Sequence, residues 1–380
     1  MHVAIVAGPD PARAFPAAAL ALGLTNNGDD VLMLTGRRWV DRLRQLGIEA
    51  EEMAGLPGEP GTPAELRHRT PEHAAAMAPA MAERIADWRP DLVVADVQSL
   101  VGAFAAEMLG LRFAQLHPHP LTASSHPGPA TTARKRGRAG WRSREGQRLS
   151  RISRQPQREL AAARASLDLP PLAPRPLMHM VATLPALEPL RSDWPRNAII
   201  VGPLTFDPAV DDLPIPEGQA PLVMVSPSTA PTNRSALLTS ALAGLGGLRV
   251  VATVLEPFDG PVPAWANVGI GRQEPLLAQA AVVVTGGGHG MIVRALTAGV
   301  PLVLAPGDGD GELELARRAE RLGAAVILRR VTPRSLRRAV DKVIKDRAYA
   351  SAARLIARTV ATADPIVLCR QTTLVGRSVA

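Results

Sequence analysis

Two doubly wound α/β domains are predicted by two features of the sequence: an alternation of strands with helices, and an interruption of that alternation in mid-chain. Short apolar runs rich in β-branched residues, typical of buried parallel strands, alternate with longer runs of helical composition. The alternation stops near Pro118, resumes at Met180 and starts again as a second series at Leu222. Because such alternation forms parallel βαβ units, we expect an open parallel sheet in each half.

The first half shows the alternation over most of its length. Strands are expected at 2–7, 30–35, 91–96, 112–116 and 180–183, and helices at 15–24, 38–46, 73–88, 100–109 and 157–167. Residues 49–71 show no clear pattern. The stretch 206–220 combines prolines with acidic residues and is typical of a linker.

The second half repeats the same alternation. Strands are expected at 222–225, 248–254, 281–285, 301–305 and 325–328, with helices between them and at 332–344 and 349–362. We therefore expect Rossmann-like domains at 1–205 and 221–380, joined by the linker 206–220. The last helix is the one element that could return to the N-terminal domain.

Composition narrows the class of protein. A chain of 380 residues with 46% apolar residues can bury large cores. No apolar run approaches the ~18 residues that a membrane-spanning helix needs. The single cysteine, Cys369, cannot form an internal disulfide and disfavours a structural zinc site. We expect a cytoplasmic protein with no metal and no membrane span, and the oligomeric state stays open.

The positive charge is concentrated in one segment, Arg134 to Arg158. It holds ten basic residues and one acid, Glu145, whereas the net charge of the whole chain is +8. A solvated surface loop is the first interpretation, and an electrostatic guide for an anionic acceptor or a membrane surface is the second. Nucleic acid is disfavoured as a partner because Trp141 is the only aromatic residue there that could stack on bases.

A glycine-rich turn is the most informative feature of the sequence. The expected strand ends at Thr285, Gly286-Gly287-Gly288-His289-Gly290 follows, and a helical run then ends at Gly299. Amide groups at a helix start point outward, and glycines let a diphosphate approach the backbone. His289 could donate a further hydrogen bond to phosphate. The alternative is a tight turn without a ligand, and the spacing is not the G-x-G-x-x-G of nicotinamide dinucleotide sites.

Several segments together resemble a known family. They are Arg272 to Leu277, Val284 to Gly290, Ala298 to Val303 and Asp310 to Gly323, with weaker matches at 15–16, 90–96, 201–204 and 225–229. This set is similar to the nucleotide-sugar signature of bacterial GT-B glycosyltransferases, which act on macrolides and other natural products and are related to UDP-glucuronosyltransferases. The resemblance implies a GT-B fold of two domains that face each other across a cleft. It also implies a nucleotide sugar on the C-terminal domain, an acceptor on the N-terminal domain, and inversion without a metal.

The resemblance assigns donor-binding roles residue by residue. Those implied to bind the nucleotide are Ser228, Thr229, Arg272, Gln273, Gly287, Gly288, His289 and Gly290, and Asp310 is implied to contact the sugar. The chain departs from the family pattern at Gly286, where a histidine is usual, at Met291, where a hydroxyl residue is usual, and at Gly311, where a glutamine is usual. Each lost charge-assisted hydrogen bond would cost ~1.5–3 kcal/mol.

The expected catalytic base is the largest departure. The family carries a histidine in the first loop at the position of Arg13, and an arginine cannot accept the acceptor's proton. Asp10, Asp96, His117 and His119 all follow strands of the N-terminal sheet, where ligand crevices form. His119 is our preferred substitute for the base, assisted by Asp96. Arg13 could bind an acidic acceptor or the donor phosphates, or it could be a solvated loop residue.

The sequence thus predicts a glycosyltransferase that moves a sugar from a UDP- or dTDP-linked donor to a small-molecule acceptor in natural-product biosynthesis. No cofactor is expected beyond this co-substrate. A polar, aliphatic or anionic acceptor is favoured because only 3% of the residues are aromatic. The alternative is a catalytically degenerate GT-B relative that acts as a binding or auxiliary protein.

Overall fold

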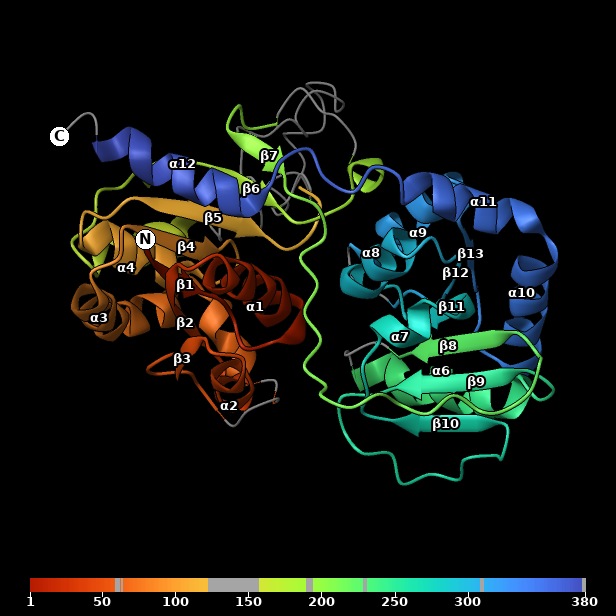
Figure 1. Ribbon diagram of the computed structural model, residues 1–380. Coiled ribbons are helices and arrows are strands. Elements are labelled where there is room, and N and C mark those ends of the chain that lie inside the picture. The colour runs from red at the N-terminus through yellow and green to blue at the C-terminus, as the bar shows by residue number, and fades with distance from the viewer. Residues whose placement is uncertain are drawn as a thin grey trace, which may run out of the picture. The chain divides into compact units, whose positions relative to one another are not determined.

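The chain divides into two compact units in a computed structural model that describes residues 1–58, 62, 64–121, 157–188, 194–227, 231–307 and 311–377. Unit 1 comprises Met1–Ala182, Leu190–Leu204 and Ala363–Ala380, and unit 2 comprises Thr183–Pro189 and Thr205–Thr362 (Figure 1). The basic segment predicted from the sequence lies, except for its last two residues, outside the described part of the chain.

Unit 1 is built on a parallel sheet in the order β3-β2-β1-β4-β5-β6-β7. Its strands are β1 (His2–Val6), β2 (Asp30–Thr35), β3 (Glu49–Glu52), β4 (Leu92–Asp96), β5 (Phe113–His117), β6 (His179–Val181) and β7 (Ala198–Ile200). The central strands are buried on both faces, which explains why their sequences are continuous apolar runs rather than alternating ones.

Helices cover both faces of this sheet. They are α1 (Pro11–Asn26), α2 (Arg37–Gln45), the 3₁₀ turn η1 (Glu65–Arg69), α3 (Pro71–Trp88), α4 (Leu100–Met108) and α12 (Pro365–Arg377), and residues 157–165 are also helical. Helices α3 and α4 share one core with the sheet. The C-terminal helix α12 belongs to unit 1 (Figure 1) and packs against α1. Its Cys369 is fully buried beside Met180 of β6.

Unit 2 repeats the architecture with a parallel sheet in the order β10-β9-β8-β11-β12-β13. Its strands are β8 (Leu222–Ser226), β9 (Arg249–Thr253), β10 (Ala266–Gly269), β11 (Ala280–Thr285), β12 (Leu302–Leu304) and β13 (Ala325–Ile327). Its helices are the 3₁₀ turn η4 (Pro185–Leu187), α6 (Pro231–Gly244), α7 (Glu274–Leu277), α8 (His289–Thr297), α9 (Glu312–Arg321), α10 (Pro333–Lys345) and α11 (Arg347–Ile356).

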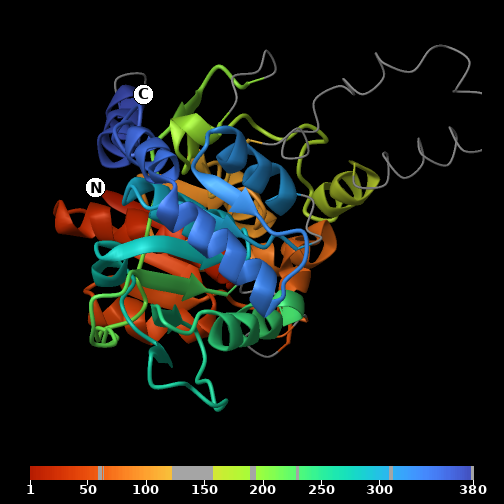
Figure 2. The ribbon, with the colours of Figure 1, turned by 90° about the vertical axis from the view of Figure 1, so that its right-hand side faces the viewer.

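Two separate apolar cores hold this second sheet. Residues of α8, α9 and α11 form one core, and residues of α6 and α10 form the other. Helices α6 (green) and α10 (blue) lie side by side (Figures 1 and 2). Helix α10 begins at a capping box in which Thr332 and Ser335 satisfy each other's backbone amides. The α/β class with two parallel sheets, as predicted from the sequence, is confirmed.

Some local expectations were wrong. The edge strands β3 and β10 were not predicted, because Glu-Ala-Glu-Glu and Ala-Asn-Val-Gly carry too few apolar residues to form a recognisable run. Helix α1 begins at Pro11, so Arg13 lies in its first turn and not in a loop. Proline is well accommodated at the first helical position, which allows this early start. Helix α11 ends at Ile356, several residues before the expected boundary at 362.

No helix within the described ranges is long and apolar enough to cross a membrane. Nor do the His, Cys, Asp and Glu side chains that the structure describes form any group of three or more that could hold a metal ion.

Candidate functional site

Each sheet has a point at which the order of its strands reverses. In unit 1 this point lies between β1 and β4, and in unit 2 it lies between β8 and β11. Loops that leave the carboxyl ends of two such strands diverge to opposite faces of the sheet, and ligands of open α/β sheets bind in the crevice between them. The residues predicted from the sequence fall largely at these two points.

In unit 2 the turn after β11 leads directly into α8. Gly287 has a φ of +89°, a conformation that suits glycine, and a Cβ there would lie 3.2 Å from Cα of Pro306. At Gly288 and Gly290, by contrast, an added Cβ would meet no atom within 4 Å. The first intrahelical bond runs from the Ile292 amide to the Gly288 carbonyl, so the three preceding amides make no bond within the helix. The turn thus presents an open backbone surface at a helix N-terminus.

His289 stands in the first turn of α8 and is half-buried. Its Nε2 lies 2.9 Å from Oγ1 of Thr183, which is fully buried. Thr183 was not predicted as a site residue because it is distant in sequence and carries no motif. This contact occupies one of the two ring nitrogens of His289.

Gln273 is held by three neighbours. Its backbone N–H donates to Oδ2 of Asp207 over 2.6 Å. In its side chain, Nε2 donates to Oγ1 of Thr253 over 3.1 Å, and Oε1 accepts from Arg294 of α8. Burial lowers the pKa of the Arg294 guanidinium, an effect that Asp207 opposes from 3.7 Å. These contacts tie the loop before α7 to the helix that carries His289.

Arg272, which precedes Gln273 in the sequence, makes its contacts away from α8. Its exposed side chain pairs with Asp212 at 3.4 Å, so its charge is directed to the 205–221 segment. We find no contact of Arg272 with the α8 turn among the described interactions.

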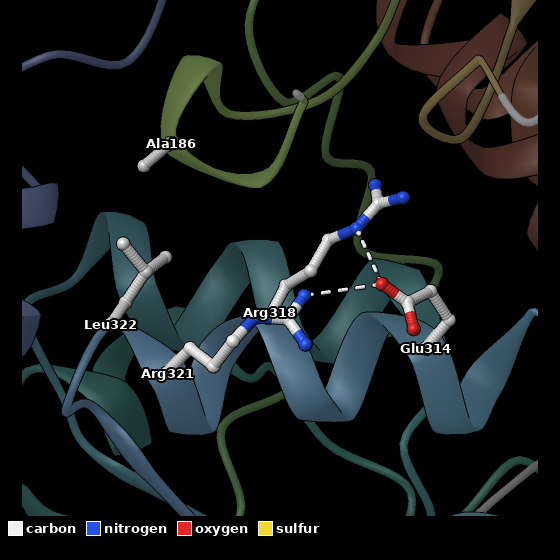
Figure 3. A pocket seen from close by; sticks show the side chains of 5 residues that line it. All are labelled: Ala186, Glu314, Arg318, Arg321 and Leu322. Atoms are coloured by element: carbon white, nitrogen blue, oxygen red, sulfur yellow. Dashed lines mark hydrogen bonds and ion pairs between the residues drawn. The ribbon is translucent and has the colours of Figure 1, made fainter. Parts of the chain in front are cut away.

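Helix α9 borders a hollow of about 280 Å³. Ala186 of η4 lines it together with Glu314, Arg318, Arg321 and Leu322 (Figure 3). Glu314 accepts hydrogen bonds from Arg318 and Arg321, and the bond from Arg321 is the main cause of its lowered pKa. Glu314 is therefore paired with two arginines of its own helix.

In unit 1 the reversal point is filled by charged side chains. Arg13 of α1 donates to Nε2 of His119 through Nη1 and to Oε1 of Gln98 through Nη2. Its Nε lies 3.9 Å from Oδ2 of Asp96, the last residue of β4. The structure thus brings together all three residues predicted as catalytic. Gln98 was not predicted, although its position directly after β4 is a signal that could have indicated it.

Burial dominates the electrostatics of this group. It raises the pKa of Asp96 to about 6, against the opposing effects of Arg13 and of the amides of Gln98 and Gly8. It also lowers the pKa of the Arg13 guanidinium, and Asp96 and Asp10 oppose that shift. Arg13 is 6% exposed and Asp96 is 3% exposed. Asp96 and Arg13 therefore form a buried ion pair. At acid pH the pair loses its negative charge, because the Asp96 carboxylate takes up a proton.

Three further groups complete the unit 1 cluster. Oδ2 of Asp10 pairs with Arg69 at 2.7 Å. His68 of η1 is fully buried, its Nδ1 lies 2.7 Å from the Glu65 carbonyl, and burial lowers its pKa. Its Nε2 would lie 2.8 Å from a Cβ at Gly8. His68 was not predicted, because residues 49–71 gave no pattern from which its position could be inferred. His117, also buried, contacts His179 on the neighbouring strand at 2.9 Å.

Three predicted donor-site residues lie outside the described part of the chain: Ser228, Thr229 and Asp310. Their described neighbours are well placed, since Ser226 ends β8 in register with Thr285 of β11.

Comparisons with known proteins match both the C-terminal part of the chain and nearly its whole length. The family described as "Erythromycin biosynthesis protein CIII-like, C-terminal domain" matches residues 268–371. The 4'-demethylrebeccamycin synthase of Lentzea aerocolonigenes is 26% identical over 91% of this chain and 92% of its own length. The O-mycaminosyltylonolide 6-deoxyallosyltransferase of Streptomyces fradiae is 30% identical over 50% of this chain and 46% of its own length.

Solved structures match nearly the whole chain. The glycotransferase of kitacinnamycin superimposes with a TM-score of 0.74 at 22% identity, over 99% of this chain and 98% of its own. The spinosyn rhamnosyltransferase SpnG gives 0.74 at 19% identity over 98% and 99%. The glycosyltransferase SsfS6 of Streptomyces sp. SF2575, complexed with thymidine diphosphate, gives 0.71 at 20% identity over 98% and 99%. At these identities the likeness shows a shared fold.

Proposed function

We propose that this chain, a nucleotide-sugar-dependent GT-B glycosyltransferase with an EryCIII-like C-terminal domain, uses its two reversal points as half-sites for donor and acceptor. Enzymes of this kind glycosylate natural products, and the relative from Streptomyces fradiae is by name a 6-deoxyallosyltransferase. The prediction of a glycosyltransferase from the sequence is confirmed.

The donor half-site is the turn from Gly286 to Gly290 with the N-terminus of α8. The open backbone at Gly288 and Gly290 is the observation that carries this assignment, because a diphosphate needs close approach to amide groups and a side chain there would prevent it. His289 supplies a side-chain donor beside those amides. The diphosphate gains negative charge as it leaves, so donors fixed in advance at this helix end stabilise the transition state.

The nucleotide is thymidine diphosphate in this proposal. Two similar structures, those of SsfS6 and SpnG, were solved with this nucleotide bound. Gln273 lies beside α8 and is held rigidly by Asp207, Thr253 and Arg294, so its loop offers a preformed edge for the base. Preformed contacts of this kind reduce the ordering cost of binding.

The acceptor half-site is the Arg13 cluster of unit 1, made of Arg13, Asp96, Gln98 and His119. The acceptor oxygen attacks the anomeric carbon as the bond to the diphosphate breaks, and the bonding electrons leave with the diphosphate. Attack from the face opposite the leaving group inverts the configuration. Support for this placement comes from the position of the cluster at the carboxyl ends of β1, β4 and β5.

Calorimetric titration of the full chain with dTDP, UDP and GDP at one fixed salt concentration tests the donor assignment. We expect dTDP to bind most tightly, and His289→Ala to weaken it by about tenfold or more, as loss of a charge-assisted hydrogen bond implies. His2→Ala, which removes an exposed histidine of unit 1, is the matched control. Equal affinity of wild type and His289→Ala would refute the site.

A further inference from the structure

The acceptor half-site contains carboxylates and histidines, yet each described one is engaged. The Asp96 carboxylate accepts hydrogen bonds from the backbone amide of Gly8 at 3.5 Å and from that of Gln98 at 3.2 Å. It also lies 3.9 Å from Nε of Arg13. Oδ2 of Asp10 is paired with Arg69 at 2.7 Å. Neither carboxylate is presented to a ligand as a proton acceptor.

The nearby histidines are no better placed, and Nε2 of His117 lies 2.9 Å from Nδ1 of His179. Arginine is always a donor, so Nε2 of His119 must accept from Arg13, and its lone pair is not available for a proton. His68 is fully buried with Nδ1 against the Glu65 carbonyl, out of reach of a bound acceptor. An acceptor hydroxyl that had to lose its proton would find no ready base among these groups.

Arg13 itself is held in an unusual way. Its two terminal nitrogens, the fork that suits a carboxylate, are satisfied by neutral side chains, the His119 ring and the Gln98 amide. Gln98 is exposed and His119 is half-buried, whereas Arg13, to which both are hydrogen-bonded, is buried. A carboxylate binds such a fork through two parallel charge-assisted bonds, which are stronger than bonds to neutral acceptors.

We propose, on the basis of the function above, that the attacking oxygen of the acceptor is a carboxylate, held by the Arg13 fork in place of Gln98 and His119. The substrate class is therefore a carboxylic acid, and the product is a glycosyl ester. An arginine at the position of the family's base then has a direct chemical reason, because this nucleophile needs no base.

The reaction balances without a proton acceptor. One carboxylate oxygen forms a bond to the anomeric carbon, the bond between that carbon and the diphosphate oxygen breaks, and the nucleoside diphosphate departs with the electron pair. Carboxylic acids have pKa values near ~4, so the nucleophile is already ionised at neutral pH. A neutral alcohol would instead release one proton for each sugar transferred.

Three probes with the same ring test the inference: benzoate, benzamide and benzyl alcohol. They are titrated into the full chain saturated with dTDP. We expect benzoate to bind about tenfold more tightly than either neutral probe. With dTDP-glucose as donor, benzoate should give a product that hydroxylamine converts to a hydroxamate, with no proton released in weakly buffered solution.

Gln98 provides variants that leave Arg13 in place. Gln98→Glu puts a carboxylate of the protein on the fork and should weaken benzoate binding about tenfold, with little effect on the neutral probes. Gln98→Ala, the matched control, uncovers the fork and should leave benzoate affinity equal or higher. Because Gln98 is exposed, both variants should fold.

The outcomes separate this inference from the proposed function. Equal binding of benzoate and benzamide, or benzoate binding that Gln98→Glu does not change, overturns the inference while dTDP binding stands. Transfer to benzyl alcohol with proton release, and none to benzoate, also overturns it. Loss of all nucleotide binding would instead contradict the donor half-site. The comparison of benzoate affinity with that of the neutral probes tests the inference even if glucose is not the sugar that the enzyme transfers.

Discussion

The same strand–turn–helix unit occurs at both reversal points, and the two copies are built in opposite ways. After β1, the turn at Gly8 is filled, because an added Cβ would lie 2.8 Å from Nε2 of His68. After β11, the turn at Gly288 is open, and an added Cβ would meet nothing within 4 Å. Glycine serves packing in the first turn and access to the backbone in the second.

The difference explains what each turn can recognise. The β11 turn offers main-chain amides and one histidine, a surface suited to a diphosphate whatever the sugar attached to it. The β1 turn is followed by the guanidinium of Arg13 on α1, which is fixed by Asp96 at the end of β4 and by Gln98 and His119 in the loops after β4 and β5; such a group suits one particular group on a ligand. In the proposed half-sites, donor binding would thus rest on backbone shape, and acceptor binding on the identity of a few side chains.

The largest expected effect is on the free energy of unfolding, and the substitution of Arg13 tests whether the unit 1 cluster also stabilises the fold. Arg13→Met leaves Asp96 buried without its cation and should lower the free energy of unfolding by about 3–5 kcal/mol at pH 8. The loss should shrink at pH 5, where Asp96 can take up a proton. Urea unfolding of Arg13→Met and of Arg13→Met/Asp96→Asn checks this, since the double variant should recover most of the stability. His289→Ala, at the open turn, should unfold like wild type.

The next largest effect is the pH dependence of folding stability that Asp96 causes. Burial raises the pKa of Asp96 to about 6, so the folded chain holds this proton more tightly than the unfolded chain does. Stability from this group is therefore greatest at acid pH and falls as the pH rises from ~4 to about 6, by on the order of 3 kcal/mol at most.

Comparing Asp96→Asn with wild type by urea unfolding across this pH range checks the slope. The groups that act on Asp96, namely Arg13, Asp10 and the backbone amides of Gln98 and Gly8, are the same in both proteins. Parallel curves for the two proteins would contradict the prediction.

The two glycines give a direct test of the filled and open turns. Gly8→Ala should destabilise the protein by about 1–3 kcal/mol, because the methyl group would overlap the His68 ring. Gly288→Ala, at a φ of −61°, should leave thermal stability nearly unchanged while it weakens dTDP binding. Thermal melts and calorimetry on both variants measure the contrast. Unchanged dTDP affinity in Gly288→Ala would mean that the open backbone is not a ligand surface.

A smaller effect is expected at Thr183. Thr183→Val removes the hydroxyl at Nε2 of His289 and should cost ~0.5–1.5 kcal/mol of dTDP binding, with rescue by Thr183→Ser. Nitrogen-15 NMR of the imidazole should show a changed tautomer population, which a purely structural role would not produce. Thr373→Val, another buried threonine, is the control. An unaltered imidazole spectrum would exclude a positioning role for Thr183.

The smallest effect has opposite signs for stability and binding. Gly290 lies inside α8, so Gly290→Ala should stabilise the protein by about 0.5–1 kcal/mol through helix propensity. The same methyl group would enter the space expected for the diphosphate, so dTDP affinity should fall. Melting temperature and calorimetric affinity should therefore move in opposite directions. If both rise, the diphosphate does not approach at this residue.

Most of the fold was predictable because buried parallel strands are continuous apolar runs. The three apolar cores and the order of the elements follow from that pattern. The edge strands β3 and β10 did not follow from it, since an edge strand buries too little surface to require apolar residues. The start of α1 was missed for another reason: Pro9 and Pro11 suggested a loop, although Pro11 is the first residue of the helix.

The two half-sites differ in how far sequence could indicate them. The β11 turn is contiguous, so Gly287 to Gly290 could be recognised from spacing alone. The unit 1 cluster depends on Arg13 of α1, His68 of η1, and Asp96 of β4 with Gln98 in the turn after it. These are three separate parts of the chain, and their proximity depends on strand order. Thr183 is a similar case, because its contact with His289 joins residues 106 positions apart. Spacing within one segment carries no information about such contacts.

The path of the chain limits how halves of such enzymes can be exchanged. Residues 183–189, which lie between β6 and β7 in the sequence, belong to unit 2. Helix α12, at the C-terminal end, belongs to unit 1 and packs on α1. A hybrid made by one crossover in the 205–221 segment would inherit α12 from a foreign parent, and with it Ile366 against Gly23 and Arg370 against Asp29. Recombination that respects these contacts needs a second junction near residue 363, so that α12 and unit 1 descend from the same parent.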